Sequence, residues 1–509
     1  MGRWILLGLL FSLEANAAKL NLGISQDAIN VQRSGEAVRG FSKIEVRGYE
    51  LSRKVGEPEL PVKSVLVYGA PKDIQVSVNY KKSFLIEKLK PMPVQEQPCR
   101  CASDKKRSFA YNAKSYQNKQ KYSVETLGWW RGQPVSRIDI PLAKYDASKN
   151  AVQVVEDVDV EHNAVAFSVN SEQYKDYLIV VPARMSSGVV EFAQWKTSQG
   201  YNVIIEKLET PQITLDGIAK LISENYTKNG IDFVLMVGDE TVLPMYQVPT
   251  SAGQATTDIK YFTLDGSGDY VPDLFYGRIV ATTADEAAQH LAKSMEFEKT
   301  GTKNLQGISH LIGIASDEGS SPSDDEYVKS IEDKFVQTFG YTDTHYYQGE
   351  QKSNPTELNK SLNTGAAWLF YMGHGSGYSW PSLRQEYSIE HVAEIKNATQ
   401  IKPIIIDVAC ANGRLLPGYL GSAFSDVTNK DAFGAAAYYG GTVNISWHPP
   451  AIMARGIAFE HAAKNFKHLG EALFAGQMYL AANWDSQSDI IDNFEWYQLQ
   501  GDPSLHIRE

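Results

Sequence analysis

Short apolar runs alternate with amphipathic stretches through the last two thirds of the chain. The runs are five to seven residues long and rich in aliphatic residues, which is typical of buried strands. The stretches between them carry apolar residues at helical spacing. The pattern predicts strands at 177–182, 202–206, 233–237, 310–315, 368–372, 403–409 and 434–440, and helices at 189–198, 215–228, 284–299, 325–339, 386–399, 451–464 and 471–484. Such alternation predicts a doubly wound α/β domain with mostly parallel sheets, large enough for two linked sheets.

The first third of the chain has a different pattern. Apolar and polar residues alternate with period two in 76–80, 136–141 and 152–161, and no long helical pattern interrupts them. This predicts a β-rich, sandwich-like module. Composition changes around residues 170–176, so we expect a β-rich domain at 18–172 and an α/β domain at 173–509.

The first 17 residues resemble a secretory signal peptide. Arg3 supplies the positive charge, residues 4–13 are apolar, and Ala15-Asn16-Ala17 forms a small-x-small cleavage site. The alternative is an uncut N-terminal anchor. No later apolar run approaches the roughly 18 residues of a membrane-spanning helix. We therefore expect a secreted, periplasmic or cell-surface protein with no transmembrane segment after signal removal.

Composition and net charge limit the kinds of binding partner that we expect. The 509 residues carry a net charge of −11 and a pI near 5.5, which argues against nucleic acid or an anionic membrane as the main partner. The three cysteines are Cys99, Cys101 and Cys410. Residues 95–121 are polar and basic, which predicts an exposed, protease-sensitive loop whose two cysteines are unremarkable or bonded to each other. Metal binding by this pair would need further ligands, which the loop lacks.

Two candidate catalytic residues follow neighbouring predicted strands. His374 comes after 368–372 and Cys410 after 403–409, with the predicted helix 386–399 between them. In a parallel βαβ unit both residues lie beyond the carboxyl ends of the strands, where open sheets bind ligands. A thiol beside an imidazole is a nucleophile–base pair. The alternative is a buried small Cys and a structural His. Gly373 and Gly375 favour catalysis, because they leave backbone N–H groups accessible.

Other chemistry finds less support. A carboxylate at Asp317 or Glu318, after the strand 310–315, could orient His374. The serine-hydrolase elbow G-x-S-x-G around Ser376 would need glycine at positions 374 and 378, which hold His and Tyr, and neither a P-loop nor an H-E-x-x-H motif occurs. The acidic segment 265–273 offers oxygen ligands for a structural calcium ion, although a solvated turn accounts for it better.

These residues together resemble a known family. The segment 373–376, Gly-His-Gly-Ser, followed by 407–413, Asp-Val-Ala-Cys-Ala-Asn-Gly, is similar to the catalytic segment of the gingipain-type cysteine peptidases, which share a clan with caspases and legumain. Further similar motifs occur in the family's order at 234–239, 276–279, 314–319, 442–447 and 501–505. Residues 55–61 resemble the start of the family's inhibitory propeptide. The resemblance implies a caspase-like catalytic domain preceded by a β-rich propeptide.

The resemblance also implies roles for individual residues. Cys410 matches the nucleophile, His374 the catalytic histidine and Glu318 the carboxylate that orients it. The backbone N–H groups of Gly375 and Cys410 would form the oxyanion hole. The walls of the pocket for the residue before the scissile bond match Trp447 and Val408.

The resemblance extends to specificity. Arginine-cleaving members place an Asp at the base of that pocket, and the similarity places Asp325 there. A carboxylate can bind a planar guanidinium through two hydrogen bonds. The alternative is that Asp325 belongs to an acidic cluster that stabilises a helix N-terminus.

We therefore expect a secreted cysteine endopeptidase made as a zymogen, with protein or peptide substrates, its own propeptide as inhibitor and no cofactor required for catalysis. Self-cleavage after Arg100, Arg107 or Arg184 is the corresponding hypothesis for activation. Two alternatives remain open. One is a sortase-like transpeptidase of the same fold, and the other is a catalytically inactive binding module.

Overall fold

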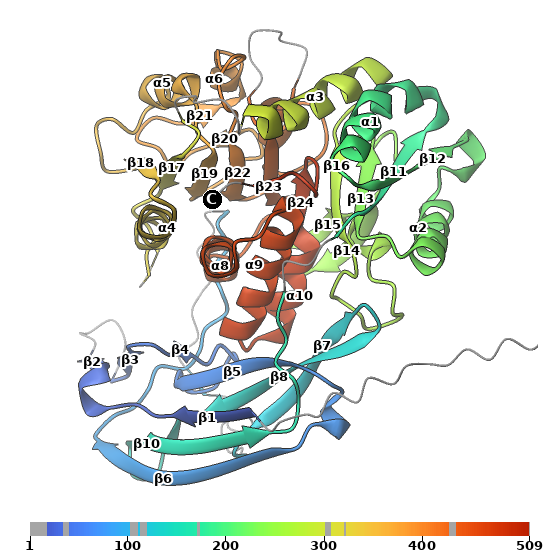
Figure 1. Cartoon of the computed structure of the whole chain (residues 1–509). Coiled ribbons are helices and arrows are strands. Elements are labelled where there is room, and N and C mark those ends of the chain that lie inside the picture. Colours follow the sequence, from blue (N-terminus) through green and yellow to red (C-terminus); the bar gives the residue numbers. More distant parts are fainter. Residues whose placement is uncertain are drawn as a thin grey trace, which may run out of the picture. The chain divides into compact units, whose positions relative to one another are not determined.

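A computed structural model describes residues 18–33, 40–101, 110–111, 120–169, 174–300, 307–319, 322–426 and 434–507. The expected signal peptide and Arg107 lie outside the described residues. The chain forms two compact units (Figure 1). Among described residues, the second unit comprises 169–507 together with two short segments from the N-terminal part, 95–101 and 128–132. The first unit comprises the remainder.

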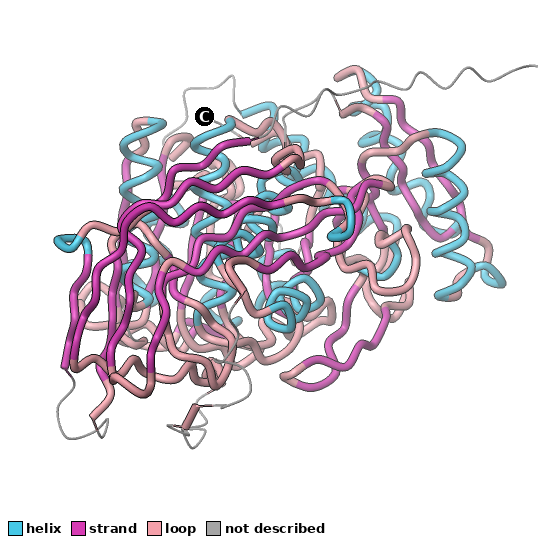
Figure 2. Tube along the Cα trace, turned by 90° about the horizontal axis from the view of Figure 1, so that it is seen from below, coloured by secondary structure: helices cyan, strands magenta, loops and turns pink. Residues whose placement is uncertain are grey.

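The first unit is built from antiparallel sheets, drawn in blue to teal in Figure 1, and Figure 2 shows its extended strands in magenta. One four-stranded sheet contains β1 (Ala18–Leu22), β6 (Val76–Glu87), β9 (Ala143–Asp146) and β10 (Ala151–His162). The other contains β4 (Glu50–Leu51), β5 (Pro61–Tyr68), β7 (Ser123–Trp130) and β8 (Gln133–Pro141). A separate pair is formed by β2 (Ile29–Arg33) and β3 (Ser42–Val46). Val67, Ile138 and Val158 from the two larger sheets share one core, as the period-two pattern predicts.

The second unit is organised around a ten-stranded sheet. Its strand order is β12-β11-β13-β16-β24-β23-β22-β19-β17-β18. The bounds are β11 Asp176–Pro182, β12 Asn202–Leu208, β13 Phe233–Val237, β16 Phe275–Ile279, β17 His310–Ala315, β18 Thr342–Tyr347, β19 Trp368–Met372, β22 Ile404–Val408, β23 Ala437–Gly441 and β24 Tyr497–Gln500.

All neighbouring strands of this sheet are parallel except β23 and β24. The sheet therefore consists of two parallel halves that run in opposite directions. The carboxyl ends of β23, β22, β19, β17 and β18 meet at one edge. The predicted α/β class with mostly parallel strands is confirmed.

Helices cover both faces of the half that carries β17, β19 and β22. On one face, α5 (Pro355–Thr364), α6 (Ile389–Val392) and α7 (Leu420–Ser425) share a core with Leu369 and Ile405. On the other face, Phe335 of α4 (Asp324–Phe339) packs against Trp368 and Phe370. His461 of α8 (His448–Lys464) lies beside Trp368. The strands are buried on both sides, which explains their continuous apolar sequences.

The remaining helices are α1 (Val190–Ser198), α2 (Leu215–Asn229), α3 (Ala284–Thr300), α9 (Leu469–Asn483) and α10 (Gln487–Trp496). Two small hairpins complete the unit, formed by β14 (Tyr246–Thr250) with β15 (Gly253–Thr257) and by β20 (Ser379–Trp380) with β21 (Tyr387–Ser388). No helix among the described residues is long and apolar enough to cross a membrane.

The predicted helix 386–399 is largely wrong, because only α6, four residues long, forms there. Long-range hydrogen bonds replace helical ones beyond it. The backbone N–H of Lys396 donates to Asn363 Oδ1 (2.6 Å), and the Asn397 side chain donates to the carbonyl of Gly434 (2.9 Å). These partners lie far away in sequence, so the local pattern could not reveal them.

Candidate active site

Three adjacent strands bring the candidate residues to one edge of the sheet. Residues Trp368–Met372 pair in parallel register with Ile404–Val408 on one side and with β17 on the other. The backbone N–H of Gly373 donates to the carbonyl of Val408 (3.2 Å). His374, Cys410 and Glu318 therefore follow the carboxyl ends of three neighbouring strands, as the βαβ argument predicts.

Gly375 brings the two catalytic loops into contact. A Cβ atom at this position would lie 2.4 Å from the carbonyl oxygen of Cys410 and 2.6 Å from its nitrogen. Such distances are impossible for a real side chain, so only glycine allows the backbones to approach this closely. The peptide groups of Gly375 and Cys410, which are the expected oxyanion-hole donors, are thereby adjacent.

Cys410 is a buried, unpaired thiol. Its Sγ accepts a hydrogen bond from the backbone N–H of Ile445 (3.4 Å). Burial raises the pKa of Cys410 to about 11, although the Ile445 N–H and the charge of Arg100 oppose the shift. The following residue, Ala411, has a φ of 56°, a left-handed conformation that costs a non-glycine residue about 1–2 kcal/mol. A left-handed turn residue thus follows a buried thiol whose raised pKa favours the neutral form.

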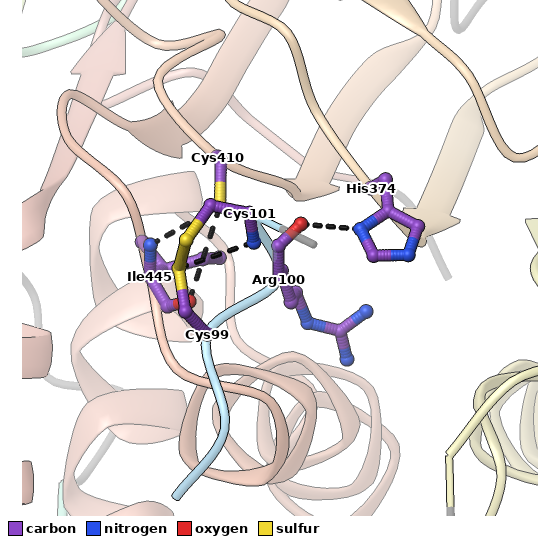
Figure 3. The surroundings of a disulfide bond; sticks show 6 residues. All are labelled: Cys99, Arg100, Cys101, His374, Cys410 and Ile445. Carbon is purple, nitrogen blue, oxygen red and sulfur yellow. Dashed lines mark hydrogen bonds between the residues drawn. A yellow bond between two sulfur atoms is a disulfide. The ribbon is translucent and has the colours of Figure 1, made fainter. Parts of the chain in front are cut away.

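His374 lies between two hydrogen-bond acceptors. Its Nε2 is 3.2 Å from Glu318 Oε2, and its Nδ1 contacts the backbone carbonyl of Arg100 (Figure 3). Each ring nitrogen thus faces an oxygen that can accept a hydrogen bond. The ring also packs edge-on against Trp447, with centroids 5.4 Å apart.

Arg100 precedes the other residues of the site by more than 200 positions in the sequence. Its side chain lies at the same edge of the sheet. Its guanidinium donates to both oxygens of Asp324, at 2.7 and 2.8 Å. It also donates to the carbonyl of Trp447 (2.8 Å) and lies 4.5 Å from the centre of the Trp447 ring. Arg100 and Asp324 are both fully buried. Burial lowers the pKa of Arg100, but the carboxylate of Asp324 outweighs this and leaves the pKa raised.

The backbone around Arg100 pairs like an added strand. The N–H of Arg100 donates to the carbonyl of Ile445 (2.9 Å), and the N–H of Trp447 donates to the carbonyl of Pro98 (3.0 Å). Cys99 and Ser446 form the antiparallel bridge between these two bonds. Peptides that occupy clefts commonly bind in this way, with backbone hydrogen bonds for affinity and a side-chain pocket for specificity.

The aspartate that meets the guanidinium is Asp324, not the Asp325 that the resemblance suggests. Asp324 is the first residue of α4, and its Oδ2 also accepts from Ser316 Oγ (2.6 Å). Asp325 is partly exposed and accepts a hydrogen bond from Ser323 Oγ, at the start of the same helix. Three consecutive acidic residues made a one-residue shift invisible in the sequence.

The other expected pocket residues lie nearby. Trp447 lines the space around Arg100, as described. Val408 is buried at the end of β22, where its carbonyl accepts the N–H of Gly373. The structure thus brings the sequence candidates together at this edge, except that Asp324 replaces Asp325 beside the guanidinium.

Two residues without a predicted role fasten the catalytic loops. The Asn412 side chain accepts from the N–H of Gly377 (2.9 Å) and donates to Asp407 Oδ2 (3.1 Å). Asp407 also accepts from Trp380 Nε1 (3.1 Å), and burial raises its pKa to about 7. Both residues lie within the segment 407–413 whose sequence resembles the family, and besides bonding to each other they bind Gly377 and Trp380 of the other loop.

Cys99 and Cys101 form a disulfide on either side of Arg100 (Figure 3). This agrees with the expectation that the two thiols bond to each other. The expectation of an exposed loop is wrong for residues 95–101, because Arg100 is buried and the cysteines are half-buried. A basic segment can be buried here because a carboxylate distant in sequence compensates the charge of Arg100.

In the acidic segment 265–273, residues 265–268 are exposed and include the turn that the sequence favours, but the two aspartates that follow are not solvated. Asp269 and Asp273 are buried, and with Asp265 they place three carboxylate oxygens within 4.8 Å of one another. Backbone N–H groups donate to Asp273 from Leu264 (2.9 Å) and Arg131 (2.5 Å). The Oδ2 atom of Asp269 is buried and has no hydrogen-bond partner among the described residues.

Comparison with known proteins identifies relatives across most of the chain. Residues 170–508 match the model of Peptidase family C25. The Lys-gingipain HG66 of Porphyromonas gingivalis is 24% identical over 476 residues, which cover 80% of this chain. The Lys-gingipain W83 of the same organism is 23% identical over 468 residues. The chain spans about a quarter of the length of these curated relatives, with 26% of each covered.

Solved structures show the same fold. The Arg-specific cysteine proteinase gingipain R (RgpB) matches with a TM-score of 0.59 and 22% identity, covering 67% of this chain and 80% of that one. The complex of the pro- and mature domains of Porphyromonas gingivalis RgpB matches with a TM-score of 0.57 and 22% identity, covering 65% and 80%.

Proposed function

Because the chain belongs to peptidase family C25, the gingipain-type cysteine peptidases, we propose that it is a secreted cysteine endopeptidase, made as a zymogen, that cleaves after arginine. The observation that carries the proposal is Arg100, whose guanidinium binds Asp324 while its carbonyl contacts His374. An arginine that reaches both a buried carboxylate and the catalytic histidine occupies the position expected of the residue before a scissile bond.

The names of the relatives indicate different specificities. The curated relatives are called Lys-gingipains, whereas one solved structure is called Arg-specific. The pocket itself favours arginine. Two oxygens of Asp324 and the carbonyl of Trp447 face the planar guanidinium from two sides, and the indole ring lies against it. A lysine ammonium is a point charge and would lose the paired hydrogen bonds.

In the proposed reaction the Cys410 thiolate attacks the carbonyl carbon of the substrate arginine. Negative charge develops on the carbonyl oxygen and is stabilised by the adjacent N–H groups of Gly375 and Cys410. His374 donates a proton to the leaving amine, with Glu318 on Nε2 fixing the ring. Water then hydrolyses the thioester and releases the arginine carboxylate.

Latency follows from the same contacts. Residues 98–100 fill the position where a substrate would pair with residues 445–447, and the imidazole is engaged by the Arg100 carbonyl. Burial keeps the pKa of Cys410 at about 11, so the thiolate is scarce near neutral pH. We therefore assign the N-terminal part the role of an intramolecular inhibitor, to be removed by proteolysis.

The test is a panel of fluorogenic peptides that differ only in the residue before the scissile bond. Wild type and Cys410→Ala are compared after limited proteolytic activation. Cleavage after arginine that disappears in Cys410→Ala supports the proposal. Cysteine-dependent cleavage after another residue would reject the arginine specificity, and absence of cleavage by either protein would reject the peptidase.

We also propose that the cluster of Asp265, Asp269 and Asp273 holds a structural calcium ion. Hard carboxylate oxygens are the ligands that calcium prefers, and the buried Oδ2 of Asp269 accepts no hydrogen bond from the residues that the structure describes. The cluster contributes no step to catalysis. It would fix the segments that contain Trp129 and Arg131, whose N–H groups bond to Asp269 (3.0 Å) and Asp273.

A further inference from the structure

The Cys99–Cys101 disulfide encloses Arg100, whose guanidinium binds Asp324 at the candidate site. Only Arg100 separates the two cysteines, and the Cys101 N–H donates to Cys99 Sγ (3.1 Å). Arg100 thus lies at the tip of a small covalent ring. Its side chain, N–H and carbonyl are each bonded to the site, through Asp324, Ile445 and His374.

The ring bends the chain where a substrate would continue. Residues 98–99 are extended against 445–447, whereas residues 100–101 form a turn. A substrate that spans a peptidase cleft must pass through in an extended form, so that residues on both sides of the scissile bond are held. The disulfide prevents this for the bond between Arg100 and Cys101.

The carbonyl of Arg100 has a correspondingly unproductive orientation. Its oxygen contacts His374 Nδ1, and among described residues it makes no hydrogen bond to the N–H groups of Gly375 or Cys410. Attack by Cys410 requires the oxygen to be where those N–H groups can stabilise its developing charge. It also requires an imidazole that is free to protonate the leaving amine. The oxidised ring satisfies neither condition.

We propose that the Cys99–Cys101 disulfide is a redox latch that makes Arg100 an inhibitor when oxidised and a cleavage site when reduced. The proposal rests on the peptidase function proposed above. A dithiol supplies two electrons and two protons, leaves as its own disulfide, and produces free thiols on Cys99 and Cys101. Both cysteines are half-buried, so they are not sealed from such a reductant.

Cleavage then follows the ordinary reaction. Once the ring opens, the chain beyond Arg100 can extend, and the Arg100 carbonyl can turn toward Gly375 and Cys410. Cys410 Sγ forms a thioester with the Arg100 carbonyl carbon as the peptide bond breaks, and the Cys101 amine leaves with a proton from His374. Water hydrolyses the thioester. The new N-terminus is Cys101, and the reductant that opens the latch also keeps Cys410 as a thiol.

The experiment uses the full chain purified without reductant. Wild type and the double variant Cys99→Ser/Cys101→Ser are incubated with and without dithiothreitol, and cleavage after Arg100 is followed by intact mass and N-terminal sequencing. Matched controls carry Cys410→Ala in each background. We expect oxidised wild type to be cleaved only slowly after Arg100, and dithiothreitol to accelerate that cleavage. The serine variant should be cleaved without reductant about 100-fold faster than oxidised wild type, the factor that misplacement of a reacting group by about 1 Å can cost. Both Cys410→Ala controls should stay intact.

Two results would overturn the latch. One is oxidised wild type cleaving after Arg100 as fast as reduced wild type, and the other is a folded serine variant that remains as latent as oxidised wild type. If that variant does not fold, the comparison of wild type with and without dithiothreitol decides. Trypsin-activated wild type assayed without reductant separates the two proposals. Cysteine-dependent activity there with no redox effect on the zymogen rejects only the latch, whereas its absence rejects the peptidase itself.

Discussion

Replacement of Asp324 by asparagine should remove most activity toward arginine substrates, whereas the same change at Asp325 should not. Asp324 is buried and accepts two charge-assisted hydrogen bonds from a guanidinium, at 2.7 and 2.8 Å. Asp325 is its immediate neighbour, is partly exposed and bonds to Ser323. The pair of variants therefore separates a pocket carboxylate from the general charge of the helix N-terminus.

The size of the loss in activity follows from leaving the buried guanidinium of the substrate arginine without its carboxylate partner. Removing one partner of a buried ion pair costs about 3–5 kcal/mol. Because about 1.4 kcal/mol corresponds to a factor of ten, Asp324→Asn should lower kcat/KM for an arginine peptide by about 150- to 5000-fold. Asparagine keeps the shape of the side chain and one acceptor for Ser316 Oγ, so the helix start should be preserved.

The assay compares the activated variants on two peptides, one with arginine and one with its neutral analogue citrulline before the scissile bond. Asp324→Asn should lose activity on arginine and far less on citrulline, because citrulline has no charge to leave unpaired. Asp325→Asn should remain within a few-fold of wild type on both. A large loss for Asp325→Asn with an active Asp324→Asn would refute the assignment of the pocket carboxylate.

Three further predictions concern the catalytic loops and the acidic cluster. Glu318→Gln should lower kcat by less than about 100-fold, which is the low end of general acid–base effects, because Glu318 orients His374 from a half-exposed position. An unchanged dependence of kcat on pH would contradict this prediction. Gly375→Ala should give a folded protein whose kcat falls by at least about 100-fold, since the new Cβ would meet the Cys410 peptide. Circular dichroism checks that the variant is folded. A variant that turns over at the wild-type rate would contradict the prediction. Burial raises the pKa of Asp273 to about 7. Without a metal, the native state therefore keeps a proton on Asp273 that the unfolded state loses above about pH 4. The stability of the native state should fall as pH rises from about 4 to 7. Calcium should offset this, raising Tm over an EDTA control more at pH 8 than at pH 5, and Asp269→Asn should abolish the gain; an equal gain in that variant would exclude the site.

The buried strands were the most predictable part of the fold. The bounds of 233–237, 310–315 and 368–372 agree with the structure residue for residue. These strands are buried, so nearly every position is apolar, His310 at the start of one strand being the polar exception. β18, by contrast, lies at the edge of the sheet and has exposed residues, and its sequence Thr-Asp-Thr-His-Tyr-Tyr gave no strand signal.

The candidate site was predictable as far as its chemistry is local. His374 and Cys410 follow strand ends that the sequence marks with glycine. Arg100 was missed as an occupant of the site, because its buried environment is supplied by Asp324 and Trp447, at separations of 224 and 347 residues. A polar, basic segment resembles an exposed loop until its charge partner is known.

The separation between Arg100 and Asp324 also has a consequence for synthesis. A ribosome that adds about 5–20 residues per second completes Arg100 some 10 to 45 seconds before Asp324, which is 224 positions later. Cys410 emerges later still. The segment that fills the pocket is therefore already present on the nascent chain when the pocket first folds. In a chain made in this order, Arg100 can bind the pocket as the pocket first forms, without a separate inhibitor chain having to find it.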